Sequence, residues 1–317
     1  MWRSILARVV VGIATLAGVA TLVFFGTEAL PGDAAQAALG PESTPELVER
    51  YRREFGLDRP LTERFGSWVA GFARGDLGKS LPSGDPVTEI IAGKIRNTGF
   101  LALLTLGILV PTSVLLGVFA AIRRDGKLDH AVTSSTLGMV AAPEFVVGSL
   151  LVVVFAVWLG LVPPVSVVDP TRSFFGQLNI LILPIATLLT HVLAQTTRMI
   201  RACVIAELGK EYVQLAILKG LPPWRVLFRH VLPNAIAPTL QILAMNVAWL
   251  LGGVVVVEAV FQFPGLGLTM SKAVATRDIA TVQAVALLIT ATYVLVNILV
   301  DMLLVVLNPR LRAAARA

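Results

Sequence analysis

Residues 99–122 read GFLALLTLGILVPTSVLLGVFAAI, a stretch of twenty-four residues without a charged side chain. As a helix rising about 1.5 Å per residue, it is long enough to cross the roughly 30 Å hydrocarbon core of a bilayer. Of the 317 residues in the chain, 56% are hydrophobic and only 15% are charged. The mean hydropathy of +0.81 is typical of proteins that cross the membrane several times.

Six segments have the length and the apolar character of membrane-spanning helices: about 9–27, 99–122, 131–158, 178–200, 235–257 and 279–304. In lipid, backbone groups must bond within the segment, so we expect helices. The first span exceeds the roughly 7–15 apolar residues of a cleaved signal peptide, so we expect it to remain in the protein. The sequence therefore predicts an all-α polytopic membrane protein with one domain over 1–317.

The distribution of Lys and Arg predicts the orientation of the spans. The segment before the first span, the 123–130 turn, the 198–233 segment and the end after 301 hold two, three, six and three of them. The alternate short segments, 162–177 and 258–278, hold one and two. Both termini and the 198–233 segment are therefore expected in the cytoplasm. The 28–98 loop holds nine, but long segments cross largely regardless of charge, so it is expected outside.

The outer loop at 28–98 shows two amphipathic patterns and one misleading motif. Apolar residues recur at helical spacing from Leu61 to Phe72, and a second such pattern covers 86–95. The stretch ARGDLGKS at 73–80 ends like a phosphate-binding loop. However, Ala73 stands where that motif needs Gly, and no strand-to-helix turn surrounds it. We therefore predict no nucleotide site in this chain.

The segment at 205–234 is more patterned than a simple connector needs to be. Polar residues recur at helical spacing on one face, and apolar residues fill the other sides: Glu207, Lys210, Glu211 and Gln214 against Tyr212, Val213, Ala216 and Ile217. Gly220 is expected to end this helix. Pro222 and Pro223 then start a second helix running to Pro233, and Asn234 caps the next span.

This segment resembles the cytoplasmic loop of permeases of bacterial ABC importers, whose pattern is Glu-Ala-Ala, three residues, Gly, nine residues, Ile-x-Leu-Pro. Four residues stand in register with it: Ala216, Gly220, Leu232 and Pro233. Gln214, Leu215 and His230 depart from it in a way that resembles the dipeptide and oligopeptide branch. ALPGD at 29–33 and the segments 55–81, 258–267 and 297–312 are similar to the first of the two permease subunits in that branch.

The resemblance implies an inner-membrane permease that pairs with a second, homologous permease. Two cytoplasmic ATPases would bind the ATP and Mg, and an extracytoplasmic peptide-binding protein would deliver the substrate. This chain would bind no cofactor, metal or nucleic acid, would contact membrane lipid, and would not be an enzyme. The loop at 205–234 would couple to an ATPase, with contacts from Tyr212, Ala216, Lys219, Gly220 and Leu221 and further motif positions at His230, Leu232 and Pro233.

Three polar residues are candidates for the translocation path or its gate. Glu144 interrupts the third span near its middle, where a charge is costly, so it either lines the path or is a buried polar or protonated residue paired with another subunit. Asn246 forms either an interhelical hydrogen bond or a substrate contact. Glu258 begins the family-like EAVFQFPGLG, whose Pro264, Gly265 and Gly267 predict a fixed turn at the outer gate.

Two questions stay open at the level of sequence. A stand-alone secondary transporter or channel is the alternative class, but it should show internal repeats and more charged residues along the midplane. Within the favoured class, the cargo could be a dipeptide, an oligopeptide, glutathione, a nickel complex or haem.

Overall fold

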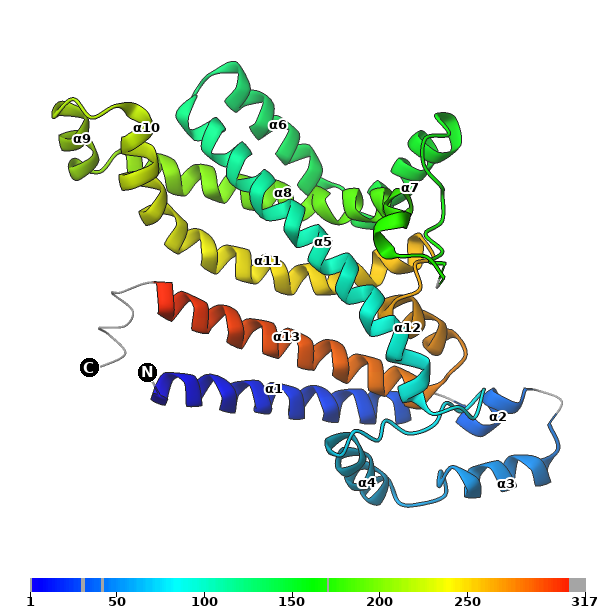
Figure 1. The fold of residues 1–317 in the computed structure, drawn as a ribbon. Coiled ribbons are helices and arrows are strands. Elements are labelled where there is room, and N and C mark those ends of the chain that lie inside the picture. The colour runs from blue at the N-terminus through cyan, green and yellow to red at the C-terminus, as the bar shows by residue number, and fades with distance from the viewer. Residues whose placement is uncertain (1, 30–31, 41–42, 170, 308–317) are drawn as a thin grey trace.

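A computed structural model describes residues 2–29, 32–40, 43–169 and 171–307. Within 236–251 and 301–307, only the backbone is described for several residues. Long helices lie side by side, and the short helices that follow the first long one gather at one end of the bundle (Figure 1). The helices are α1 (Trp2–Glu28), α2 (Ala34–Leu39), α3 (Pro45–Glu54), α4 (Leu61–Ala73), α5 (Val87–Ile122), α6 (Lys127–Ala141), α7 (Glu144–Leu151), α8 (Leu178–Leu208), α9 (Glu211–Leu218), α10 (Pro223–Val226), α11 (Leu232–Val260), α12 (Leu266–Ala275) and α13 (Ile279–Leu307). Three tighter or wider helical segments complete the fold: the π-helices η1 (Val152–Trp158) and η3 (Leu227–Val231) and the 3-10 helix η2 (Phe174–Gln177).

The described part of the chain is helical, with one isolated bridge between Lys79 and Pro86, so the all-α prediction is confirmed. Four helices are long and apolar enough to cross a membrane: 6–28, 87–122, 175–208 and 279–300. The bent pair formed by 127–141 and 144–158 provides a fifth if it counts as one span. α11 has 29 residues and no charged residue before Glu258, which fits the predicted span at 235–257. The count of six stays a prediction.

The third predicted span, 131–158, is not straight. Its helix stops at Ala141, and α7 starts after Pro143 at an angle of 107° to α6. The residue before a proline is pushed out of the helical region, and Ala142 has ψ of 132°. Glu144 therefore lies in the first turn of α7 rather than in the middle of a continuous helix, which corrects the prediction.

The second predicted span is longer than the 99–122 segment. The amphipathic segment at 86–95 joins it without a break, so α5 covers 36 residues and carries Pro111 inside. The predicted helix at 61–72 is confirmed as α4, which packs on α1 through an aromatic cluster of Phe24, Phe25, Phe65 and Trp68. α2, α3 and α12 were not predicted as helices.

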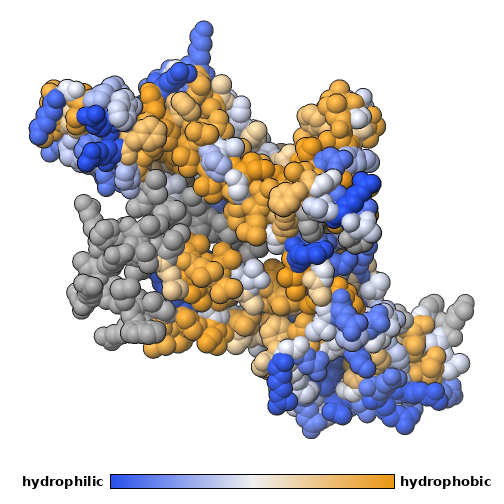
Figure 2. All heavy atoms as spheres, in the orientation of Figure 1, coloured by the Kyte–Doolittle hydropathy of each residue, from blue (hydrophilic) through white to orange (hydrophobic). Residues whose placement is uncertain are grey.

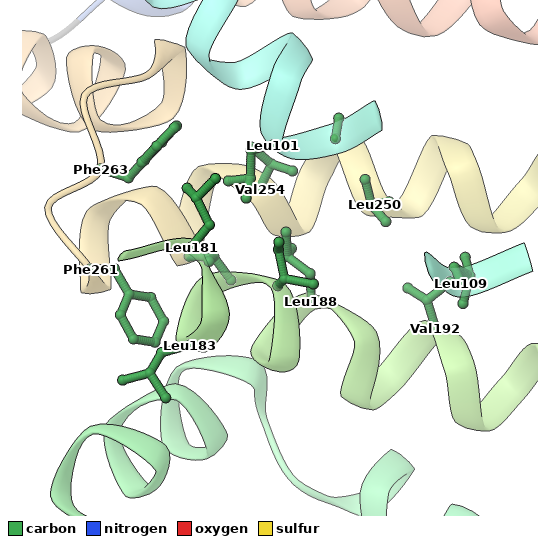
Figure 3. Packing of buried hydrophobic residues seen from close by; sticks show 13 residues of the cluster. Leu101, Leu109, Leu181, Leu183, Leu188, Val192, Leu250, Val254, Phe261 and Phe263 are labelled. Carbon is green, nitrogen blue, oxygen red and sulfur yellow. The ribbon is translucent and has the colours of Figure 1, made fainter. Parts of the chain in front are cut away.

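The main core lies where α5, α8 and α11 cross (Figure 3). Leu101 and Leu109 of α5, Leu188 of α8 and Leu250 of α11 are fully buried there. The outer surfaces of the long helices are largely apolar, whereas polar residues gather at the end with α2 to α4 (Figure 2). Apolar side chains on an exposed helix surface suit contact with lipid or with another membrane protein.

The outer loop is fixed to the start of α13 by Asp278. The Asp278 carboxylate, 5% exposed, accepts hydrogen bonds from Ser80 Oγ at 2.6 Å, from Leu81 N at 3.2 Å and from Thr281 Oγ1 at 2.6 Å. Ser80 of the Gly-Lys-Ser motif at 78–80 therefore attaches the outer loop to the start of α13.

Candidate functional site

The first predicted helix of the loop at 205–234 is present as α9, but it starts later than the pattern indicated, because Glu207 belongs to the end of α8 and a break at Gly209 and Lys210 separates the two helices. α9 starts after Lys210, whose backbone is extended, and ends where Gly220 takes a φ of +76°. Gly220 N donates to Ile217 O at 2.9 Å and Leu221 N to Ala216 O at 3.3 Å, so both carbonyls at the helix end are bonded. Because that φ favours glycine, Gly220 sets the break between α9 and α10.

One face of α9 packs against its own chain. Val213 is fully buried and Ala216 is 6% exposed. They belong to a cluster with residues from α5, α8, α10, η3 and α11: Val118, Ala121, Ile200, Val204, Val226, Val231 and Ala235. The methyl group of Ala216 packs within this chain, and its predicted contact with an ATPase stays a prediction. Leu221 is half-buried against the same cluster.

Tyr212 ties α9 to the ends of two long helices. Its hydroxyl donates to the Glu207 carboxylate and lies 3.1 Å from His230 O, while Asn234 Nδ2 donates to the hydroxyl at 3.0 Å. Lys210 Nζ lies 2.6 Å from Glu207 Oε2. Burial, together with the neighbouring Glu207 carboxylate, raises the pKa of Tyr212, so the hydroxyl stays protonated as a donor. We call Tyr212, Glu207 and Asn234 the loop brace.

The second half of the loop differs from the prediction. α10, η3 and α11 form one continuous run, so the second helix does not end at Pro233 and Asn234 is not a helix cap. Pro233 has no N–H and so cannot continue the backbone hydrogen bonds of the helix. A π-turn precedes it, in which Leu232 N donates to Leu227 O. Asn234 Nδ2 instead donates to His230 O at 2.8 Å.

The other face of the loop carries large apolar side chains that are exposed. Leu218 is 83% exposed, and Leu215, Trp224 and Phe228 are 54%, 61% and 64% exposed. Lys219 and Gly220 are exposed beside them. The sequence analysis missed these four apolar residues, although bulky apolar residues in a segment outside the spans were a visible signal. The loop is thus rigidly attached on one face and available on the other.

At the opposite end of α11, Glu258 holds the turn that was predicted there. Glu258 is fully buried, and its carboxylate accepts hydrogen bonds from Thr98 Oγ1 at 2.6 Å, from Gly267 N at 2.6 Å and from Leu268 N at 3.2 Å. A Cβ atom at Gly267 would lie 2.4 Å from Val255 Cα, so glycine is needed for this close crossing of α11 and α12. Glu258 thus fixes the turn and does not line an open path here; its role at a gate stays a prediction.

The remaining polar candidates fall in different environments. Asn246 is 4% exposed and donates to Thr196 Oγ1 of α8 at 2.7 Å, so the alternative of an interhelical hydrogen bond is observed. Glu144 is half-buried, and its Oε2 would lie 2.7 Å from a Cβ at Gly253, so it faces α11. The family-like segment at 297–312 is described only as far as residue 307.

No three His, Cys, Asp or Glu side chains come together as a metal site within the part of the chain that the structure describes. The loop at 205–234 presents a short helix, braced from behind, with apolar side chains and one lysine on its outer face.

Comparisons with known proteins give the family. Residues 113–313 match the model described as binding-protein-dependent transport system inner membrane component, and residues 1–98 match the model of its N-terminal part. A probable peptide ABC transporter permease protein of Sinorhizobium fredii is 36% identical over 97% of this chain and 98% of its own length. A putative peptide transport system permease protein of Brucella abortus is 36% identical over 98% and 99%.

A glutathione transport system permease protein of Escherichia coli is 34% identical over 98% of this chain and 99% of its own length. The family models cover the loop at 205–234, the turn at Glu258 and most of the outer segment. The resemblance inferred from sequence is thereby confirmed. The chain belongs to the binding-protein-dependent transport system inner membrane component family, and is a multi-pass inner-membrane permease of an ABC importer.

Proposed function

We propose that this chain forms half of the path of an ATP-driven importer of dipeptides or oligopeptides. A second, homologous permease would form the other half, and an extracytoplasmic binding protein would deliver the peptide. Two ATPase subunits would bind ATP and Mg, while this chain binds neither. Peptide cargo is supported by the relatives, two named for peptide and one for glutathione transport.

The observation that carries the proposal is the arrangement of α9. Its exposed Leu215 and Leu218 suit a helix that docks into a groove of another protein. Its buried face and the loop brace attach it to α5, α8 and α11, so force on α9 reaches three long helices. Such attachment suits alternating access, in which closure of the ATPases moves the loop and turns the bundle between inward-facing and outward-facing states.

The distribution of basic residues supports the side of the membrane proposed for the loop at 205–234. The end of the bundle with α9, α10 and the turn after α5 also holds the start of α1 and the end of α13 (Figure 1). Basic residues such as Arg123, Arg124 and Lys127 cluster there, which supports a cytoplasmic location of this end and of both termini. The outer loop with α2 to α4 would then meet the binding protein.

Cross-linking tests the docking of α9. In a background with Cys203 replaced by Ser, a cysteine at Leu218 should form a cross-link to an ATPase subunit in cells that express the whole importer. A cysteine at Leu161, which is 68% exposed near the other end of the bundle, is the matched control and should not. Cross-linking of both sites, or of neither, would contradict the proposal.

A further inference from the structure

An ion pair joins α6 to α8 near the proposed cytoplasmic end. Arg201 Nε lies 2.5 Å from Asp129 Oδ1 and Nη2 lies 2.6 Å from Oδ2, so the pair is bidentate. The Asp129 side chain is 3% exposed and that of Arg201 is 26% exposed. Asp125 N donates to Asp129 Oδ2 at 2.9 Å, which also fixes the turn before α6. The carboxylate is thus bonded on both oxygens.

The pair is the ion pair that attaches α6 to α8. Among the fifteen residues of this helix, all of them described, only Asp129 and Thr136 are buried. The Thr136 hydroxyl bonds to Thr133 O within the same helix. α6 therefore lies on α8 without a buried apolar residue of its own. A bidentate ion pair resists sliding because its two parallel bonds fix direction as well as distance.

Arg201 lies on the part of α8 that carries the loop. Glu207 of the loop brace follows six residues later on the same helix, and Ile200 and Val204 pack in the cluster that holds α9. At Gly117 of α5, a Cβ atom would lie 2.8 Å from the Ile200 Cβ, so these helices touch closely. The loop at 205–234, the end of α8 and the end of α5 therefore pack together, and we call them the loop unit.

At its other end, α6 leads to the bend at Pro143 and into α7. α7 packs on α8 and α11: a Cβ at Gly148 would lie 3.3 Å from both Phe261 and Thr187, and Glu144 lies against Gly253. Phe261 starts the turn that Glu258 holds. α6 and α7 together thus run from the loop unit to the outer turn, with the bend between them.

We propose that Asp129 and Arg201 are positioning residues that make α6 follow α8 when the loop is displaced, so that the displacement reaches the bend, α7 and the outer turn. This inference rests on the proposed function, because it needs the loop to be moved by an ATPase. The pair carries no substrate and performs no chemistry. It determines whether motion at the loop is converted into motion at the path.

The test uses the whole importer reconstituted in lipid vesicles with loaded binding protein. The readout is the number of peptides transported per ATP hydrolysed, because a general loss of folding or assembly lowers both rates and leaves this ratio unchanged. Arg201→Lys keeps the charge but loses the planar, bidentate geometry. Arg198→Lys, an exposed arginine one turn away on the same helix, is the matched control.

Arg201→Lys and Asp129→Asn should each lower the ratio about five-fold or more, the range of ordinary coupling between sites, while Arg198→Lys leaves it unchanged. The double variant should be no worse than either single one, because the two residues act as a pair. A ratio within error of the wild type, or additive losses in the double variant, would overturn the inference. Failure of the wild-type importer to hydrolyse ATP in response to binding protein would instead refute the proposed function.

Discussion

Replacement of Leu218 by Ala isolates the docking of α9 from its attachment. Leu218 is 83% exposed, so its side chain contributes almost nothing to the stability of this chain. Burial of a whole leucine side chain is worth about 1.5–3 kcal/mol, so the exposed part should contribute about 1.5–2 kcal/mol to ATPase binding. That loss weakens the binding about 10- to 30-fold.

The assay is titration of the purified permease pair with the ATPase subunits, alongside thermal unfolding of the pair. Val213→Ala provides the contrast: Val213 is fully buried, so this change should lower the unfolding temperature. Leu218→Ala should leave that temperature unchanged. Unchanged ATPase affinity in Leu218→Ala would refute the assignment of the exposed face of α9 as the docking surface.

Three further changes test the structure of the loop and of the outer turn. Gly267→Ala should lower the free energy of unfolding by about 3 kcal/mol, the upper end for overpacking, because the added Cβ would meet the Val255 backbone. Thermal unfolding should show this loss. Gly252→Ala is the control and should be tolerated, because a Cβ there would have nothing within 4 Å. Tyr212→Phe removes the hydroxyl of the loop brace and should lower the free energy of unfolding by about 1 kcal/mol, or less because the site is partly exposed. Hydrogen exchange of the α9 amides should become faster. An unchanged exchange rate would contradict the role of the brace. Gly220→Val should destabilise the end of α9 by about 1–2 kcal/mol, because a β-branched residue is strained at the left-handed backbone angle of Gly220. Asn tolerates that angle, so Gly220→Asn should retain the ATPase binding that Gly220→Val weakens. Equal binding by both variants would contradict this reason.

Labelling tests the orientation proposed from charge. A cysteine at the exposed Ser83 should react with an impermeant reagent added to sealed cells, and one at the exposed Arg124 should not, in the Cys203→Ser background. Labelling of the cysteine at position 124, but not of the cysteine at position 83, would contradict the proposed orientation.

Sequence patterns predicted the parts of the fold that local physics decides. Length and apolar character located the long helices α1, α5, α8, α11 and α13, helical periodicity located α4, and Gly220 marked the end of α9, since each of these depends on neighbouring residues. The bend after Ala141 was missed because Pro143 is also compatible with a kinked, continuous span; packing of α7 on α11 selects the sharp turn.

The site was predicted less completely, because side-chain partners are distant in sequence. Tyr212 binds residues 5 and 22 positions away, and Arg201 lies 72 positions from Asp129. Likewise, helical spacing placed Ala216 on a face of α9 but did not show that this face packs inward. Which side of a short helix is attached and which is exposed depends on tertiary contacts that no local pattern encodes.

The most direct test of ATP-driven peptide import is uptake of labelled peptide into vesicles. We expect accumulation only when this chain is present together with a second permease, the ATPase subunits, loaded binding protein and ATP, because the family is one of transport permeases and the proposed role of α9 is to receive force from an ATPase. Accumulation of peptide by vesicles that contain this chain alone would contradict that claim.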